Sequence, residues 1–238
     1  MAGVPSRTLG AERRLPAKDA RGATVALFDL DRTLLPGSSL VALGRALVER
    51  GYVARRQMVA AAARDARFRR RGSGDRSVER VRTHALVAIA GLERDPLIAL
   101  ARDVGRELAT TVLPGARLLV DRHLAAGDEC VVLSASPQEL VAAIATAIGV
   151  HHAIGTRGEV RDGRFTGRLD GPFCYGPGKL ARLRDSLGVV DFTDAWAYAD
   201  STSDLPLLEA VRHPAAVNPD RRLRAVARAN RWPILDAS

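Results

Sequence analysis

Two pairs of aspartates each follow an apolar stretch of the chain. Asp29 and Asp31 come directly after the uncharged residues 24–28, and Asp200 and Asp204 follow a second such run. A continuous apolar run is typical of a central strand covered on both faces, where a carboxylate is stable only beyond the strand or beside a cation. A single D-x-D is also common in turns, so the first pair alone decides nothing. Together, the pairs indicate a metal site or chemistry that uses one carboxylate as a nucleophile and another as an acid.

Ser134 and Lys179 add two groups of different chemistry. Ser134 follows the apolar run 130–133, and Lys179 opens a predicted helix. Lys179 and Lys18 are the only lysines among 36 basic residues. A lysine at this place therefore indicates that a compact ammonium is needed there, and the chance survival of one codon is the alternative.

These groups are expected to converge, because the carboxyl ends of parallel strands meet at one edge of a sheet. Like charges about 4 Å apart repel by ~4 kcal/mol at an effective dielectric near 20, so gathered carboxylates need a cation. A site built from oxygen ligands, with no His or Cys nearby, favours Mg²⁺. The five histidines show no ligand spacing and are predicted to be structural.

Alternating strands and helices are expected to position this edge. Strand, helix, strand, helix is the order of a parallel sheet with helices on its faces, so the sequence predicts an α/β fold with a three-layer, Rossmann-like core. Strands are predicted at 24–29, 129–134, 195–199 and 215–217. Helices are predicted at 114–126, 137–149, 179–187 and 220–230, and a further helix is predicted to end at 211. A β-hairpin is predicted at 158–161 with 164–168.

Residues 38–111 differ from the rest, because no strand-like alternation interrupts them. Four helices in succession are too many for one crossover between strands, so they predict an inserted α-helical cap domain; ordinary crossover helices are the alternative. The helices are predicted near 38–50, 54–70, 76–91 and 95–111. The predicted organisation is a flexible basic tail at 1–22, a catalytic α/β core at 23–37 and 112–238, and the cap at 38–111.

The formal charge of +9 raises the question of nucleic-acid or anionic-membrane binding. The densest basic run, Arg64 to Arg71, holds one aromatic residue and no nucleic-acid-binding signature. It is predicted to be a solvated helix face, and a patch for anionic substrates or peripheral membrane contact is the alternative. Cys130 and Cys174 form no C-x-x-C pair, which fits a reducing cytoplasm. No stretch has the length of a membrane span or the apolar core of a secretory signal.

Four motifs follow one another along the chain: Asp29 with Asp31, then Ser134, then Lys179, then Asp200 with Asp204. In this order they resemble the motifs of the haloacid dehalogenase (HAD) superfamily of hydrolases, in the phosphoserine-phosphatase-like subfamily IB with a helical cap. The resemblance covers about residues 23–235. It implies that Asp29 is the nucleophile and Asp31 the acid/base, and that Mg²⁺ is held by Asp29, the backbone carbonyl of Asp31, Asp200 and, directly or through a neighbour, Asp204. It further implies that Ser134 and the backbone of Ala135 bind phosphate, that Ser203 belongs to the phosphate pocket, that Lys179 neutralises the phosphoryl charge and that Thr33 braces the loop.

The expected function is a Mg²⁺-dependent phosphomonoesterase that hydrolyses a small phosphorylated metabolite through an aspartyl-phosphate. Asp31 favours a phosphatase, because relatives that dehalogenate lack an acid two residues after the nucleophile. Phosphoserine-specific relatives carry a glutamate where this chain has Ser38, and an asparagine where it has Ser203, so the substrate stays open. A phosphotransferase or mutase on the same fold is one alternative, and a non-catalytic basic protein that binds nucleic acid or membranes is another.

Overall fold

The computed structural model describes residues 24–54, 86, 88–188 and 192–238. The tail predicted at 1–22, the basic run 64–71 and nearly all of the helices predicted over 54–70 and 76–91 lie outside the described residues. In the described part of the chain, no helix has the length and apolar character needed to cross a membrane.

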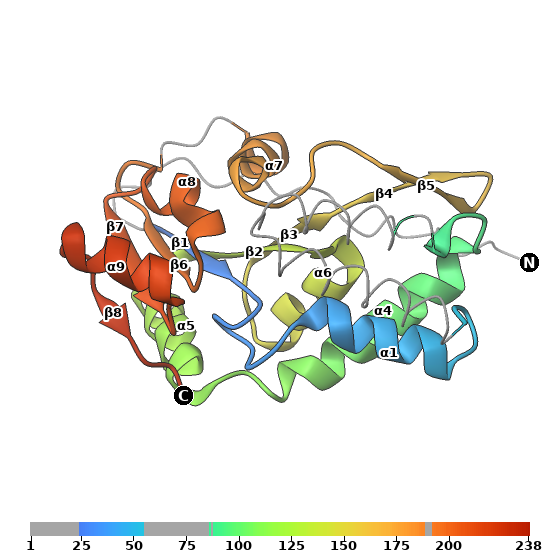
Figure 1. Cartoon of the computed structure of the whole chain (residues 1–238), viewed down its shortest axis with the longest axis horizontal. Coiled ribbons are helices and arrows are strands. Elements are labelled where there is room, and N and C mark those ends of the chain that lie inside the picture. The colour runs from blue at the N-terminus through green and yellow to red at the C-terminus, as the bar shows by residue number, and fades with distance from the viewer. Residues whose placement is uncertain (1–23, 55–85, 87, 189–191) are drawn as a thin grey trace, which may run out of the picture.

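Six strands form one sheet in the order β3-β2-β1-β6-β7-β8, and every pair is parallel (Figure 1). The strands are β1 (Val25–Asp29), β2 (Glu129–Pro137), β3 (His152–Thr156), β6 (Trp196–Ala199), β7 (His213–Val217) and β8 (Ile234–Leu235). β1 lies in the middle, where Asp29 pairs with Leu133 of β2 and Phe28 pairs with Tyr198 of β6. The residues that follow these strands therefore share one edge of the sheet, and the predicted α/β fold class is confirmed.

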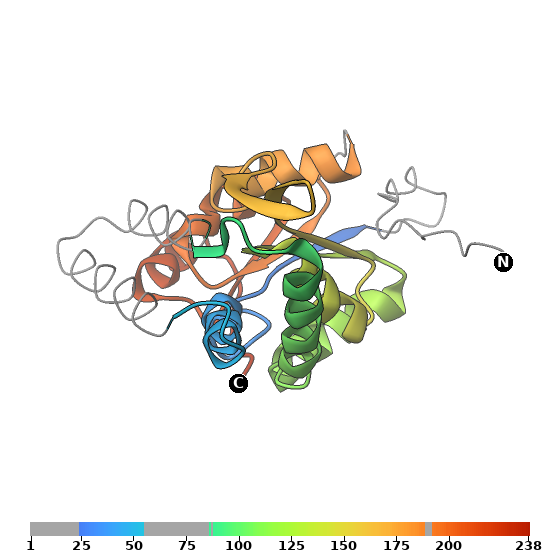
Figure 2. The same ribbon diagram turned by 90° about the vertical axis from the view of Figure 1, so that its right-hand side faces the viewer.

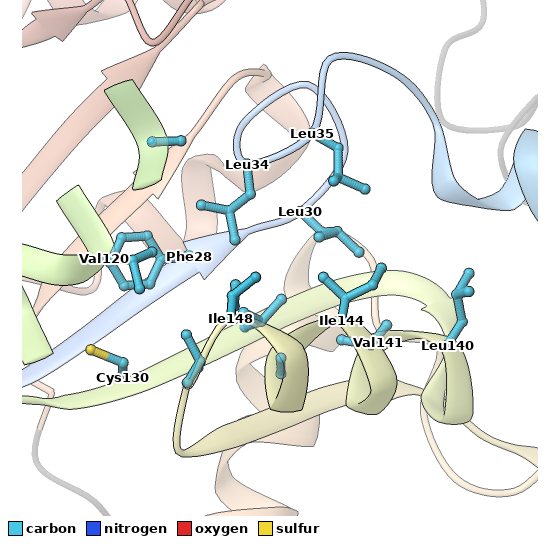
Figure 3. Close-up of a cluster of buried hydrophobic side chains, with 14 of the residues drawn as sticks. Phe28, Leu30, Leu34, Leu35, Val120, Cys130, Leu140, Val141, Ile144 and Ile148 are labelled. Carbon is cyan, nitrogen blue, oxygen red and sulfur yellow. The ribbon is translucent and has the colours of Figure 1, made fainter. Parts of the chain in front are cut away.

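Helices cover both faces of this sheet. The described helical elements are α1 (Ser39–Glu49), α4 (Arg94–Ala109), α5 (Pro114–Ala126), α6 (Gln138–Ala147), α7 (Pro177–Leu187), the 3-10 turn η1 (Thr202–Asp204), α8 (Leu205–Leu208) and α9 (Arg221–Ala229). Alternate side chains of β1 point to opposite faces, as the pleat requires. Phe28 shares one buried core with Val120 of α5 and Ile144 of α6 (Figure 3), whereas Leu27 belongs to a second core with Leu183 of α7. Two buried layers thus hold the central strand in place.

α4 packs closely against α6 of the core. Gly105 makes this approach possible, since a Cβ added there would lie 2.6 Å from the Cβ of Ala143. The predicted hairpin is present as β4 (Gly158–Arg161) and β5 (Arg164–Leu169), with Asp162 and Gly163 at its turn in left-handed conformations. Its β5 strand pairs with the segment just before α4, where Glu93 bridges to Arg164 (Figure 2). The cap at 38–111 as a separate domain stays a prediction.

Several element boundaries differ from the sequence-based expectation. The strands β3 and β8 were not expected, and the helix expected to reach Val211 ends at Leu208. β2 continues to Pro137, so α6 begins at Gln138, one residue after the predicted start at 137. Ser136 still belongs to the strand end, where its amide donates to the hydroxyl of Ser134 at 3.1 Å.

Candidate active site

Asp29 is the last residue of β1 and is almost fully buried. Its Oδ2 accepts a hydrogen bond from the hydroxyl of Thr33 at 3.0 Å, and its Oδ1 lies 2.5 Å from Nζ of Lys179. The chain turns sharply after the strand, where the amides of Leu34 and Leu35 both donate to the carbonyl of Leu30 at 3.0 Å. This turn brings Thr33 back onto the strand end, so both oxygens of Asp29 are held by fixed donors.

Lys179 reaches the same place from α7. Its Nζ also lies 2.7 Å from Oδ1 of Asp204, and its side chain is 3% exposed. Gly178 is required just before it, because a Cβ there would lie 1.9 Å from the carbonyl oxygen of Phe173. Burial opposes the ammonium form, but the charges of Asp204 and Asp29 outweigh it and raise the pKa of Lys179 above its ordinary value. Lys179 is therefore a permanent buried cation between two carboxylates.

Asp200 and Asp204 complete a group of three buried carboxylates. One oxygen from each of Asp29, Asp200 and Asp204 lies within 4.8 Å of the others. Burial raises the pKa of Asp200 to about 7 and that of Asp204 to about 6, and the charge of Asp29 adds to both shifts. Nε of Arg32 lies 2.9 Å from Oδ2 of Asp200 and partly offsets its shift. The raised pKa values indicate that the neighbouring cationic side chains do not fully offset the burial and mutual repulsion of these carboxylates.

The donor set suits a hard divalent cation. In the described residues, three clustered carboxylates meet only two cationic side chains, Lys179 and the largely exposed Arg32. All three candidate ligands are oxygens, and Mg²⁺ prefers oxygen ligands that include carboxylates. These residues therefore fit Mg²⁺. The carboxylate of Asp31 is not part of this group, so a metal role for Asp31 through its carbonyl stays a prediction.

Asp31 is held by the start of α1. Its Oδ1 accepts from the amide of Ser39 at 3.0 Å and from the hydroxyl of Ser39 at 2.5 Å, while its Oδ2 accepts from the hydroxyl of Ser38 at 3.2 Å. Ser38 is thus the N-cap residue of α1 by position, but its side chain does not cap the helix. Burial raises the pKa of Asp31, and the hydrogen bonds from Ser39 oppose this shift. A carboxyl group with a raised pKa is suited to donate a proton.

A family model of the haloacid dehalogenase-like hydrolases matches residues 26–209. The chain belongs to this family. A phosphoserine phosphatase of Mycobacterium tuberculosis is 38% identical over 238 residues, which cover 98% of this chain and 76% of that protein. A histidinol-phosphatase of Neisseria meningitidis is 31% identical over 219 residues, which cover 89% of this chain and 98% of that protein. A crystal structure of a Bordetella pertussis protein of unknown function matches with a TM-score of 0.79 at 33% identity, over 91% of this chain and 99% of that one.

These comparisons confirm the predicted family and the predicted class of enzyme, a haloacid dehalogenase-family phosphatase. They agree with the geometry, because the matched span of 26–209 includes every residue of the carboxylate group and Lys179.

Ser134, Ala135 and Ser203, which are expected to bind phosphate in a haloacid dehalogenase-like hydrolase, lie at or after the ends of β2 and β6, the two strands that flank β1. Ser134 and Ala135 directly follow Leu133, the partner of Asp29 in the sheet. The hydroxyl of Ser203 pairs with that of Ser201 at 2.7 Å. In the described part of the chain, no hydrogen bond joins the side chain of Ser134 or Ser203 to the three carboxylates. Ser203 instead lines a pocket of about 350 Å³ with Tyr175, Gly176, Pro177, Thr202, Pro206 and Arg222.

Three residues near the site of this haloacid dehalogenase-like hydrolase escaped the sequence analysis. Arg32 adopts a left-handed conformation with φ +65° and contacts Asp200. Ser39 lies at the start of the helix predicted near 38–50, and its place close to Asp31 in the sequence is a usable signal for a role at the site. Ser136 has no such signal, because its partner Ser39 lies 97 residues away in the sequence.

Proposed function

We propose that this chain is a Mg²⁺-dependent phosphomonoesterase that hydrolyses a small phosphorylated metabolite through an aspartyl-phosphate on Asp29. The observation that carries the proposal is the placement of Asp29. Its two oxygens are bound by Thr33 and Lys179, and it lies within 4.8 Å of two further carboxylates. A carboxylate fixed in this way can attack without reorganising, which is how covalent catalysis splits a slow hydrolysis into two faster steps.

In the first step, an oxygen of Asp29 forms a bond to phosphorus while the bond from phosphorus to the substrate oxygen breaks. Asp31 gives its proton to the departing alcohol and becomes a carboxylate. In the second step, Asp31 takes a proton from water, the water oxygen attacks phosphorus, and Asp29 is released together with inorganic phosphate. Lys179 stays protonated throughout and offsets the negative charge of the transferring group.

The remaining residues hold the phosphoryl group and the cation. When bound, Mg²⁺ would supply positive charge at the phosphoryl oxygens, held by Asp29, Asp200 and the carbonyl of Asp31, with Asp204 as a further ligand or neighbour. Ser134, the amide of Ala135 and Ser203 are proposed to donate hydrogen bonds to phosphate oxygens.

The proposed substrate class is a small phosphate monoester. Relatives named phosphoserine phosphatase and histidinol-phosphatase favour a phosphorylated amino acid or amino alcohol. Against phosphoserine stands Ser38, where phosphoserine-specific relatives of this family carry a glutamate; here its hydroxyl binds Asp31. The basic residues are proposed to be mainly solvated and not to bind nucleic acid, and peripheral contact with an anionic membrane stays the alternative. A cytoplasmic location stays a prediction from the cysteines.

Phosphate release from a panel of monoesters tests this function. The panel contains O-phosphoserine, histidinol phosphate, sugar phosphates, glycerol phosphate and a lipid phosphate, each with Mg²⁺ and with a chelator. Asp29→Asn is expected to abolish turnover and to prevent the covalent phosphorylation that mass spectrometry detects in the wild type. Asp103→Asn, at an exposed carboxylate of α4 paired with Arg106, is the matched control.

Two results would contradict the proposal. Turnover of Asp29→Asn within tenfold of the wild type would exclude Asp29 as the nucleophile. Transfer of most of the phosphate to an added alcohol, in place of water, would make the enzyme a phosphotransferase.

A further inference from the structure

Two buried serines, Ser39 and Ser136, connect Asp31 to the end of β2. The hydroxyl of Ser39, on a fully buried residue, lies 2.5 Å from Oδ1 of Asp31 and 2.7 Å from the hydroxyl of Ser136. The amide of Ser136 in turn donates to the hydroxyl of Ser134. The chain of contacts therefore runs from the first residue of α1 to the end of β2. A buried hydroxyl that lacks a hydrogen-bond partner destabilises the folded state, so this arrangement is stable only while its members stay paired.

The direction of these hydrogen bonds follows from the number of protons. An ionised Asp31 can only accept, so the single hydroxyl proton of Ser39 points to Oδ1 of Asp31. Ser39 must then accept from Ser136, which donates its own hydroxyl proton. Oδ1 of Asp31 also accepts from the amide of Ser39, so two donors occupy this oxygen. The other oxygen, Oδ2, has the longer contact of 3.2 Å to the exposed Ser38.

We infer that Ser39 is a positioning residue that reserves Oδ2 of Asp31 as the oxygen that carries the proton to the leaving alcohol, and that Ser136 supports it. This inference depends on the proposed acid role of Asp31. As the proton moves from Oδ2 to the departing oxygen, negative charge develops on the carboxylate. The two donors of Ser39 stabilise that charge on Oδ1 and hold the carboxyl plane fixed.

A matched arrangement at the other end of β1 provides the control. The amide and the hydroxyl of Thr24 both bind Oδ1 of Asp128, at 3.0 Å and 2.9 Å. Asp128 is hydrogen-bonded to His123 and does not belong to the three-carboxylate group. Loss of the Thr24 hydroxyl removes the same kind of bond without touching the proposed acid.

The test compares two leaving groups. p-Nitrophenyl phosphate releases a phenol that needs little protonation, whereas an alkyl phosphate such as glycerol phosphate needs the acid. The ratio of kcat/KM for the two substrates reports departure of the leaving group, because kcat/KM covers the steps up to the first irreversible one. We expect Ser39→Ala to lower kcat/KM for the alkyl phosphate at least tenfold more than for p-nitrophenyl phosphate. Ser39→Thr, which keeps the hydroxyl, should restore the ratio, and Thr24→Val should leave it unchanged.

Each outcome has a defined meaning. An Ser39→Ala enzyme that loses equal activity on both substrates would overturn the inference, because a merely structural role lowers both rates alike. If Ser39→Ala does not fold, Ser136→Ala decides: a shift of the ratio in the same direction by about threefold supports the inference, and an unchanged ratio overturns it. Asp31→Asn separates failure of this inference from failure of the proposed function. If Asp31 is not the acid, the ratio of kcat/KM for the two substrates should be the same in Asp31→Asn as in the wild type.

Discussion

Lys179 binds two carboxylates with one compact group. Its Nζ lies 2.5 Å from Oδ1 of Asp29 and 2.7 Å from Oδ1 of Asp204, in a space that leaves the side chain almost no exposure. A guanidinium is planar and larger, and it presents its donors in a fork. We therefore expect Lys179→Arg to lose at least a hundredfold in kcat/KM although it keeps the charge. Phosphate release checks this prediction, with circular dichroism to verify the fold.

A near-normal rate for Lys179→Arg would mean that only the charge matters at this position. Lys18→Arg is the matched control, since it changes the one other lysine of the chain.

At the scale of residues, the sequence identifies side chains that are unusual for their predicted place in the fold. Asp29, Asp200 and Asp204 could be found because carboxylates directly after apolar strands need an explanation, and Lys179 because lysine is rare in this chain. Ser39 and Ser136 could not be identified in the same way. Serine is common at turns and helix starts, and the contact between these two hydroxyls depends on how α1 packs beside β2.

At the scale of elements, the packing of α4 on α6 depends on one glycine. Alanine at position 105 would favour the helix intrinsically by about 1 kcal/mol relative to glycine. Its Cβ would, however, lie 2.6 Å from the Cβ of Ala143 and 2.9 Å from the carbonyl oxygen of Leu140. Carbon atoms pack at about 3.5–4.0 Å, so the helices would have to move apart. We expect Gly105→Ala to lower the free energy of unfolding by about 1–3 kcal/mol, measured by urea denaturation.

A second substitution tests the cause of that loss. Ala143→Gly removes the methyl group that the new Cβ would contact. Gly105→Ala should therefore lower the free energy of unfolding less in the Ala143→Gly variant than in the wild type. Additive losses from the two changes would show that the close contact is not the reason.

The elements themselves could be predicted to different extents. The hairpin was clear from Asp162 and Gly163, whose left-handed conformations match the turn. β3 was missed because His152 to Thr156 contains a histidine and a glycine and lacks an apolar run. Its strand conformation depends on pairing with β2, where Val131 aligns with His152. Such pairing between distant segments leaves no local pattern in the sequence.

At the scale of the whole molecule, the carboxylate group links folding to pH. Burial raises the pKa of Asp200 to about 7 and that of Asp204 to about 6, from an ordinary value of 3.8. The folded protein therefore holds protons that the unfolded chain has already released between about pH 4 and pH 7. A group of this kind contributes stability below its unfolded pKa, and this contribution is lost as the pH rises through the folded pKa. Without Mg²⁺, these groups should lower the free energy of unfolding by a few kcal/mol between pH 5 and pH 8.

Mg²⁺ should reverse this trend, because the cation competes with protons for the same oxygens. We expect the rise in melting temperature on adding 5 mM Mg²⁺, roughly a saturating amount, to be larger at pH 8 than at pH 5.5. Asp200→Asn should remove most of the pH dependence and most of the Mg²⁺ effect, whereas the exposed Asp103→Asn should change neither. Thermal unfolding curves of each protein, recorded with chelator and with Mg²⁺ at pH 5.5 and at pH 8, give the four melting temperatures that this comparison needs. If Asp200→Asn kept the wild-type response to Mg²⁺, the cation would bind elsewhere, and the buried charges would need another source of compensation.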